Sequence, residues 1–161
     1  MEIFSIHVRN WYKALHVLST CVWFGAVLSV MLIYLFSLET TTDTLLINNN
    51  AIMEKIDYWL IIPSSICSYL SGLLMSWKTN WGFFRYKWIV VKLVFGTSLI
   101  LFGIFFLNTW IVRSAETVVG NITEYQLTQK KLGISMIVQA LVIAFLIIIS
   151  NLKPWGKVSN G

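Results

Sequence analysis

Residues 132–152 read LGISMIVQALVIAFLIIISNL, a run of twenty-one residues without a charge. A helix needs about 20 predominantly apolar residues to cross a hydrocarbon core of ~30 Å. Three further stretches meet this requirement, at about residues 11–36, 56–77 and 88–112. In none of them do apolar and polar residues alternate with a period of two, as they do in the strands of a membrane barrel. The other structure that satisfies every backbone hydrogen bond in lipid is the α-helix. The sequence predicts an all-α membrane protein, a four-transmembrane-helix bundle forming one domain over residues 1–161.

The composition excludes a water-soluble globule. Of the 161 residues, 57% are hydrophobic and 12% are charged, whereas soluble domains carry about 25% charged residues. The first segment is longer than the apolar core of a signal peptide, so we expect it to be retained. The net charge of +5 is spread along one membrane face, which indicates contact with lipid headgroups and no nucleic-acid partner.

The basic residues predict the orientation of the bundle. Seven of the twelve lie in the N-terminus, the second connection and the C-terminus, and four lie in the first and third connections. The excess of Lys and Arg in cytoplasmic segments therefore places both termini in the cytoplasm. The first and third connections are expected to span roughly 14 to 20 residues, and the second to be short, which indicates two tandem helical hairpins.

Each segment carries a row of polar or small residues on one face at helical spacing. Such rows typically face the interior of a membrane bundle, where they hold helices together. The rows are Lys13, His16, Thr20, Trp23 and Val27; Asp57, Ser64, Ser68, Ser71 and Met75; Lys92, Gly96, Leu99 and Gly103; and Ser135, Gln139 and Leu146. A further row of small residues, Cys21, Gly25 and Ser29, would let another helix approach closely and makes a homodimer through this face plausible.

Two ionisable residues, His16 and Lys92, stand apart within the apolar segments. Such residues are rare in membranes, cost about 2.5–3.5 kcal/mol at a helix centre and mostly face the interior. His16 follows Trp11 by five residues and Lys92 follows Trp88 by four, so both are expected roughly 6–8 Å inside the cytoplasmic boundary. The first and third helices run in the same direction, which puts the two residues at matching depth.

Both residues have a structural and a functional interpretation. Lys92 can extend its ammonium to the headgroups, and His16 can simply hydrogen-bond a serine or a carbonyl. In the functional interpretation, His16 is a ligand of a metal or haem iron or shuttles a proton, and Lys92 pairs with an anionic group such as a propionate. His7 lies on the opposite side of a continuous helix, so a second iron ligand would come from Lys92, Met75 or another subunit, or the iron would stay five-coordinate.

Small residues are assigned to packing or to space for a ligand. Gly96 and Gly103, on the face of Lys92, would leave volume for a flat macrocycle or allow close helix packing. Cys21 and Cys67 are expected to be small buried hydrophobic residues, because a disulfide inside a bilayer is unusual and no CxxC motif is present.

Three short stretches carry a resemblance to a known group of proteins. The sequences KALHVL at 13–18 and WFG at 23–25 are similar to the first-helix motif of the HemJ and CopD-like group of small bacterial membrane proteins. The sequence RYKWIVVKL at 85–93 is similar to the third-helix motif of the same group. The chain most resembles a related branch of four-helix bacterial integral membrane proteins whose domain has no assigned function.

The resemblance implies a location in the bacterial cytoplasmic (inner) membrane and a b-type haem, with His16 as axial ligand and Lys92 as the second functional position. HemJ proteins oxidise protoporphyrinogen IX and carry a Tyr-His pair shortly after the third-helix lysine, where this chain reads ILFG at 100–103. The resemblance therefore implies binding of haem or a porphyrin and leaves open whether the chain is an enzyme.

Two other classes of function remain open. The first is a non-enzymatic transport or accessory subunit. In such a subunit, the face with Asp57, Ser64, Ser68 and Ser71 would line a path for a solute or a proton, or the protein would handle copper, as the CopD-like resemblance implies. The second is a structural partner within a larger membrane complex.

Overall fold

The computed structural model describes residues 6–40, 42–78, 83–153 and 155, with the side chains of 6–9 left out. Within these ranges the chain is almost entirely helical and contains no strand. The helices are α1 (Ile6–Leu38), α2 (Asp43–Ile56), α3 (Ile62–Lys78), α4 (Lys87–Phe102), α5 (Asn108–Thr117) and α6 (Ile122–Leu152). Two π-helical turns, η1 (Asp57–Ile61) and η2 (Gly103–Leu107), join α2 to α3 and α4 to α5.

Four helical segments of the described chain are long and apolar enough to cross a membrane. They are Asn10–Leu38, Asp43–Lys78, Lys87–Thr117 and Ile122–Leu152. The prediction of four helices long and apolar enough to span a membrane is thus confirmed.

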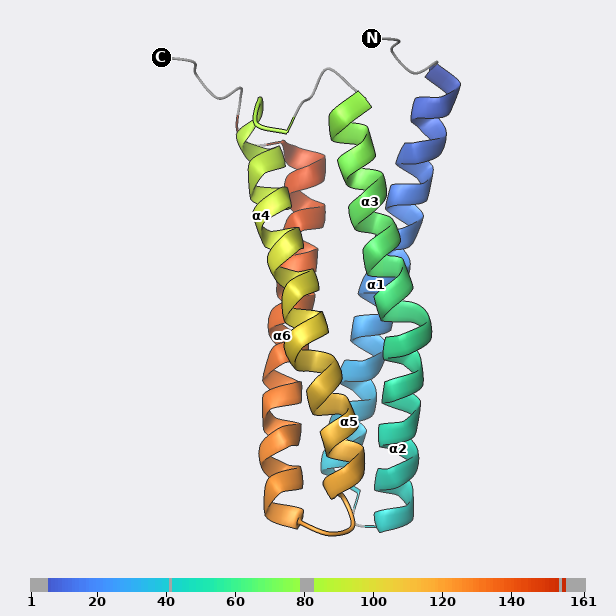
Figure 1. The fold of residues 1–161 in the computed structure, drawn as a ribbon, viewed down its shortest axis with the longest axis vertical. Coiled ribbons are helices and arrows are strands. Elements are labelled where there is room, and N and C mark those ends of the chain that lie inside the picture. The colour runs from blue at the N-terminus through green and yellow to red at the C-terminus, as the bar shows by residue number, and fades with distance from the viewer. Residues whose placement is uncertain (1–5, 41, 79–82, 154, 156–161) are drawn as a thin grey trace.

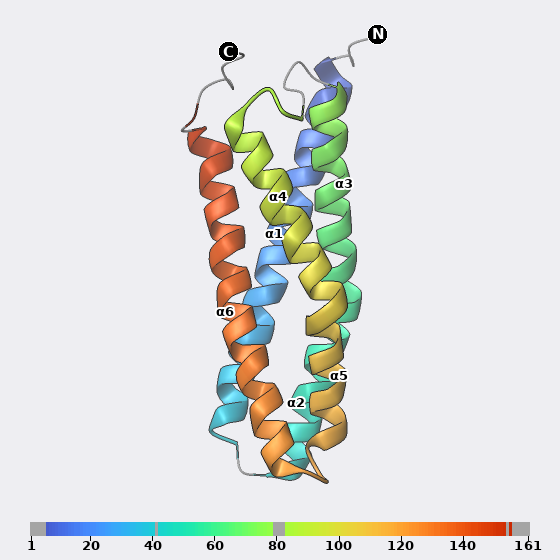
Figure 2. The same ribbon diagram turned by 60° about the vertical axis from the view of Figure 1, so that its left-hand side comes forward.

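The four segments form two antiparallel hairpins (Figures 1 and 2). In the first, α1 packs along α3; in the second, α5 and α4 pack on α6. Contacts of α1 with α6 and of α2 with α5 join the hairpins. The start of α1 and the end of α6 lie at one end of the bundle, here called the terminal end, and the opposite end is called the loop end (Figure 1).

The helices continue well beyond the apolar segments, so the prediction of long first and third connections is wrong. These connections comprise only residues 39–42 and 118–121. The polar stretches assigned to loops instead form α2, the end of α5 and the start of α6. A helix outside the hydrocarbon needs no apolar run, because water solvates its outer face and only its inner face is buried.

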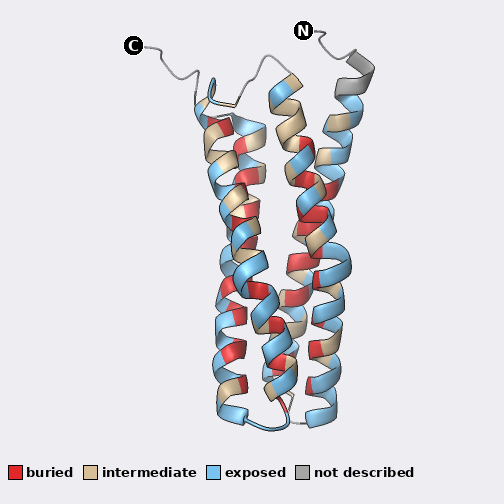
Figure 3. Cartoon of the chain, in the orientation of Figure 1, coloured by how far each residue is buried: buried red, intermediate tan, exposed pale blue. Residues whose placement is uncertain are grey.

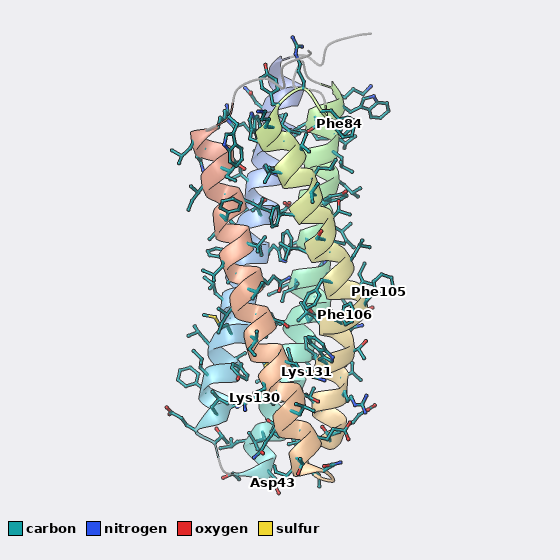
Figure 4. The ribbon with its side chains drawn as sticks, turned by 90° about the vertical axis from the view of Figure 1, so that its left-hand side faces the viewer. Asp43, Phe84, Phe105, Phe106, Lys130 and Lys131 are labelled. Atoms are coloured by element: carbon teal, nitrogen blue, oxygen red, sulfur yellow. The ribbon has the colours of Figure 1, made fainter. Side chains whose placement is uncertain are left out.

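Two lysines, Lys131 on α6 and Lys153 at its C-terminal cap, bracket the apolar part of this helix. Lys131 and Lys153 are twenty-two positions apart, which is roughly 33 Å of helix and matches a core of ~30 Å. Figure 4 shows Lys130 and Lys131 well above Asp43 at the loop end, with Phe105 and Phe106 above the lysines. A hydrocarbon core bounded by these two lysines would leave the loop end of the bundle outside the membrane.

The buried residues follow the inner faces of all four segments (Figure 3). Val27, Val30, Met136 and Ile143 at the centre of the core are at most 1% exposed. The serines and glutamine of the predicted polar rows are also buried: Ser64, Ser68, Ser71, Ser135 and Gln139. The prediction that these rows face the interior is confirmed for the serines, Asp57 and Gln139. It is wrong for Lys13, which is exposed near the start of α1.

Pro63 explains the π-helical turn that precedes α3. Proline lacks an N–H, and its ring clashes with the carbonyl four residues earlier in an α-helix, which is that of Trp59. The helical turn contains one extra residue here, so the N–H of Ile62 donates to the carbonyl of Asp57, five residues earlier. Asp57 therefore occupies the first position of a local irregularity, and such turns are frequent at functional sites.

Gly133 on α6 allows α1 to approach, because a Cβ at this position would overlap the ring of Tyr34. We expect Gly133→Ala to lower the free energy of unfolding by about 1–3 kcal/mol, as overpacked cores do, measured by chemical denaturation in detergent. Gly25→Ala is the matched control, since a Cβ there meets no atom within 4 Å. Tyr34→Leu should rescue Gly133→Ala, and equal stability of the two glycine variants would contradict the role of Gly133.

Candidate functional site

His16 lies between α1 and α3, toward the terminal end of the bundle. Its Nδ1 is 2.8 Å from the carbonyl oxygen of Ser68 and 3.2 Å from Oγ of Ser71. A carbonyl oxygen only accepts, so Nδ1 carries a proton and donates it. The hydroxyl of Ser71 donates to the carbonyl of Cys67 at 2.7 Å or of Ser68 at 2.9 Å, which leaves its oxygen free to accept from the imidazole.

A glycine makes room for the imidazole on α3. The Cβ of any larger residue at position 72 would lie 3.2 Å from Cε1 of His16, tighter than ordinary van der Waals contact. One turn further along α1, Thr20 Oγ1 lies 2.7 Å from Ser68 Oγ and 2.7 Å from the carbonyl of His16. Ser68 thus contacts α1 twice, and the imidazole is held at a fixed position on α3.

Lys92 lies on α4, and within the described ranges no hydrogen bond or ion pair joins it to His16. The neighbouring helices are held together by Tyr69, whose hydroxyl is 2.7 Å from Thr97 Oγ1. The Tyr69 ring packs against Gly96, 3.7 Å from the place a Cβ would occupy. The space above Gly96 is therefore filled, and the idea that Gly96 leaves room for a flat macrocycle is wrong; Gly103 has nothing within 4 Å.

The arrangement leaves one nitrogen of His16 available. Both described hydrogen bonds of this side chain use Nδ1, so Nε2 has no partner among the described residues. In a neutral imidazole protonated on Nδ1, Nε2 carries a lone pair that binds a metal or accepts a proton. Histidines that bind metals almost always donate their other N–H to a carbonyl, a carboxylate or water, which is what Nδ1 does here.

The cysteines differ from expectation. Cys67 is partly buried but Cys21 is exposed on the outer face of the bundle, so the prediction of a buried residue is wrong for Cys21; both are free thiols. Gly25 and Ser29 are exposed on the same face. A homodimer through this face stays a prediction.

No group of three or more His, Cys, Asp or Glu side chains in the described ranges is placed to hold a metal ion.

Sequence reasoning missed a polar cluster near the loop end. Gln129 Nε2 lies 2.9 Å from Asn50 Oδ1, 2.8 Å from Ser114 Oγ and 3.0 Å from the Tyr125 hydroxyl. Each of the four side chains is at most 6% exposed. They lie on α2, α5 and the start of α6, in stretches assigned to loops. The sequence feature that could have indicated this cluster is the i, i+4 spacing of Tyr125 and Gln129, which places both side chains on one face of a helix.

Comparison of this chain with protein-family models, curated proteins and solved structures gives no match. Its function is therefore inferred from the chemistry of its own side chains.

The protonated nitrogen of His16 is directly measurable by nitrogen NMR. The chain has two histidines, so His7→Gln leaves a single imidazole signal in protein labelled with ¹⁵N-histidine. At alkaline pH, where the ring is neutral, we expect the proton on Nδ1 and an unprotonated Nε2, because Ser68 accepts from Nδ1. Gly72→Leu should displace the ring and abolish this preference. A proton on Nε2 in the otherwise unmodified chain would contradict the geometry described here.

Proposed function

We propose that this integral membrane protein binds haem or a porphyrin-like ligand at the terminal end of the bundle. His16 would provide the axial nitrogen, Nε2, and Lys92 a cation for an anionic group such as a propionate. The observation that carries the proposal is the hydrogen bond from Nδ1 of His16 to the Ser68 carbonyl, which fixes the ring and leaves Nε2 unpartnered.

The donor set fits a haem iron better than an isolated metal ion. A porphyrin itself supplies four nitrogens, so the protein needs to add one imidazole, whereas a zinc or copper site needs several protein ligands. A haem group would supply the redox chemistry of iron. The chain would orient the imidazole and balance the negative charge of the ligand through Lys92.

The sequence similarity supports the same proposal. The motifs around His16 and Lys92 resemble those of the HemJ and CopD-like group, so we also propose that the chain is a relative of this group in the bacterial cytoplasmic membrane.

An absorption spectrum tests the ligand. We expect the protein, purified in detergent and supplied with haem, to develop a Soret band that is lost in His16→Ala, because the axial nitrogen is removed. His7→Ala is the matched control and should keep the band. Lys92→Gln should keep the band and weaken haem binding about tenfold, the effect of roughly 1.4 kcal/mol.

Iron-free protoporphyrin IX separates the contribution of the metal from that of the ring. Its fluorescence should report binding that depends on Lys92 and little on His16. Protein that stays colourless after addition of haem, or a Soret band insensitive to His16→Ala, would overturn the proposal.

We further propose that both termini are cytoplasmic, because the terminal end carries most of the basic residues. A C-terminal green fluorescent protein should fluoresce in bacterial cells, and a C-terminal alkaline phosphatase should be inactive. An active phosphatase fusion would reverse the orientation.

A further inference from the structure

Asp57 is a buried carboxyl group inside the second membrane-spanning segment. It is 5% exposed and occupies the first position of η1. Within the described ranges, no hydrogen bond or ion pair engages its side chain. A carboxylate buried without a partner is expensive, and ionisable residues inside a membrane are usually functional.

The position of Asp57 along the bundle follows from the polar cluster of Asn50 and Gln129. Asp57 comes seven residues after Asn50, which is about 10 Å of helix. Because α2 and α6 run in the same direction (Figure 1), the corresponding position on α6 is Met136. Met136 follows Lys131 by five residues, so Asp57 lies roughly 7 Å inside the boundary at the loop end.

Asp57 lacks charged neighbours that would stabilise its ionised form. On the elements packed around it, the charged and titratable groups nearest to this height are Glu54, Lys55, Tyr58, Tyr34, Lys131 and Arg113. Glu54 and Lys55 are exposed, and Arg113 pairs with Glu124 at 2.5 Å. No described interaction links any of these groups to Asp57.

The surroundings suit a proton rather than a metal ion. Hard cations such as Ca²⁺ take six to eight oxygen ligands, and no cluster of acidic or metal-binding side chains is found in the described ranges. Leu107 and Met136, at the same height, are at most 1% exposed. The buried amide of Gln139 lies three residues beyond Met136 on α6, and its Oε1 has no described partner. With no cation and no described hydrogen bond to hold a negative charge, the carboxyl of Asp57 is held at lowest cost when it is protonated and neutral.

The cluster around Gln129 offers a route toward Asp57. Asn50 Nδ2 and Gln129 Oε1 are buried there without partners. One donor and one acceptor left over in the same cluster suit a water molecule. Between the cluster and Asp57 lies an apolar layer whose members are at most 1% exposed: Met53, Ile111 and Leu132.

We propose that Asp57 is a membrane-embedded proton-binding site that exchanges its proton with the loop end of the bundle. The polar cluster of Asn50 and Gln129 holds the water that carries the proton, and the apolar layer containing Met53 limits the rate of exchange. The site is separate from the ligand site at His16: Asp57 and Ser68, which bonds His16, are eleven residues apart, about 16 Å along the helix.

A carbodiimide tests whether the carboxyl holds a releasable proton. Dicyclohexylcarbodiimide partitions into membranes, and the O–H of a protonated carboxylic acid adds across its C=N bond. The resulting O-acylisourea rearranges to a stable N-acylurea, with no group lost. We expect mass spectrometry of the full chain in lipid bilayers to find the label on Asp57 near neutral pH and to find less as pH rises. Asp43, exposed at the loop end, is the internal control and should stay unlabelled.

Variants separate a proton site from a structural residue. Asp57→Asn should abolish the label and Asp57→Glu should retain it. Asp57→Leu should leave the midpoint of thermal unfolding unchanged or raise it, because it removes a buried polar group without a partner. Absence of label on Asp57, labelling that does not vary with pH, or a lower unfolding midpoint in both Asp57→Asn and Asp57→Leu would overturn the proposal.

Infrared spectroscopy after a pH jump tests the route. The carbonyl band of protonated Asp57, identified by its absence in Asp57→Asn, should decay several-fold faster in Met53→Ser, because the hydroxyl lets water enter the apolar layer. An unchanged decay rate would exclude exchange through this layer. Neither experiment depends on haem, so the site at Asp57 and the ligand at His16 can fail independently.

Discussion

Inside the hydrocarbon, a polar group is costly unless it finds a partner within the bundle, and this constraint organises the contact between α1 and α3. Many hydroxyls here donate to their own helix: Ser19 to the carbonyl of Leu15, Thr20 to His16 and Ser71 to Cys67. Their oxygens can then only accept. The contact region is therefore rich in acceptors, and the N–H of the His16 imidazole is a donor that complements it.

The sequence was sufficient to predict the four membrane-spanning segments and their inward faces. Hydrocarbon imposes both a length of apolar sequence and a single face for polar residues such as Ser68 and Gln139, and both leave a periodic pattern. The sequence was not sufficient to predict the helical parts that lie beyond the apolar segments. Asn50 and Gln129 belong to polar stretches that look like loops by hydropathy, although only their inner faces are buried.

The sequence was sufficient to choose the candidate residues of the site, but not to predict which residues they contact. His16 and Lys92 are recognisable because ionisable residues are rare in apolar segments. The partner of His16 depends on how far α1 and α3 slide past each other, and no periodicity within one helix fixes that register. Likewise, nothing in the sequence around Gly96 shows that a tyrosine from another helix, Tyr69, fills the space above it.

His16 lies toward the terminal end of the bundle and Asp57 toward the loop end, and their surroundings differ in kind. Nδ1 of His16 is hydrogen-bonded to Ser68, which fixes the orientation of the ring and leaves Nε2 unpartnered. The carboxyl of Asp57 has no described partner, so the protonated, neutral form has the lowest free energy. The serines between them do not form a continuous chain in this conformation, because Ser64 and Ser71 donate to carbonyls of their own helix. A proton path along the whole stripe would therefore need a second conformation in which these hydroxyls turn away from the backbone. Without such a rearrangement, the proposed sites at His16 and Asp57 would each be in contact only with their own end of the bundle.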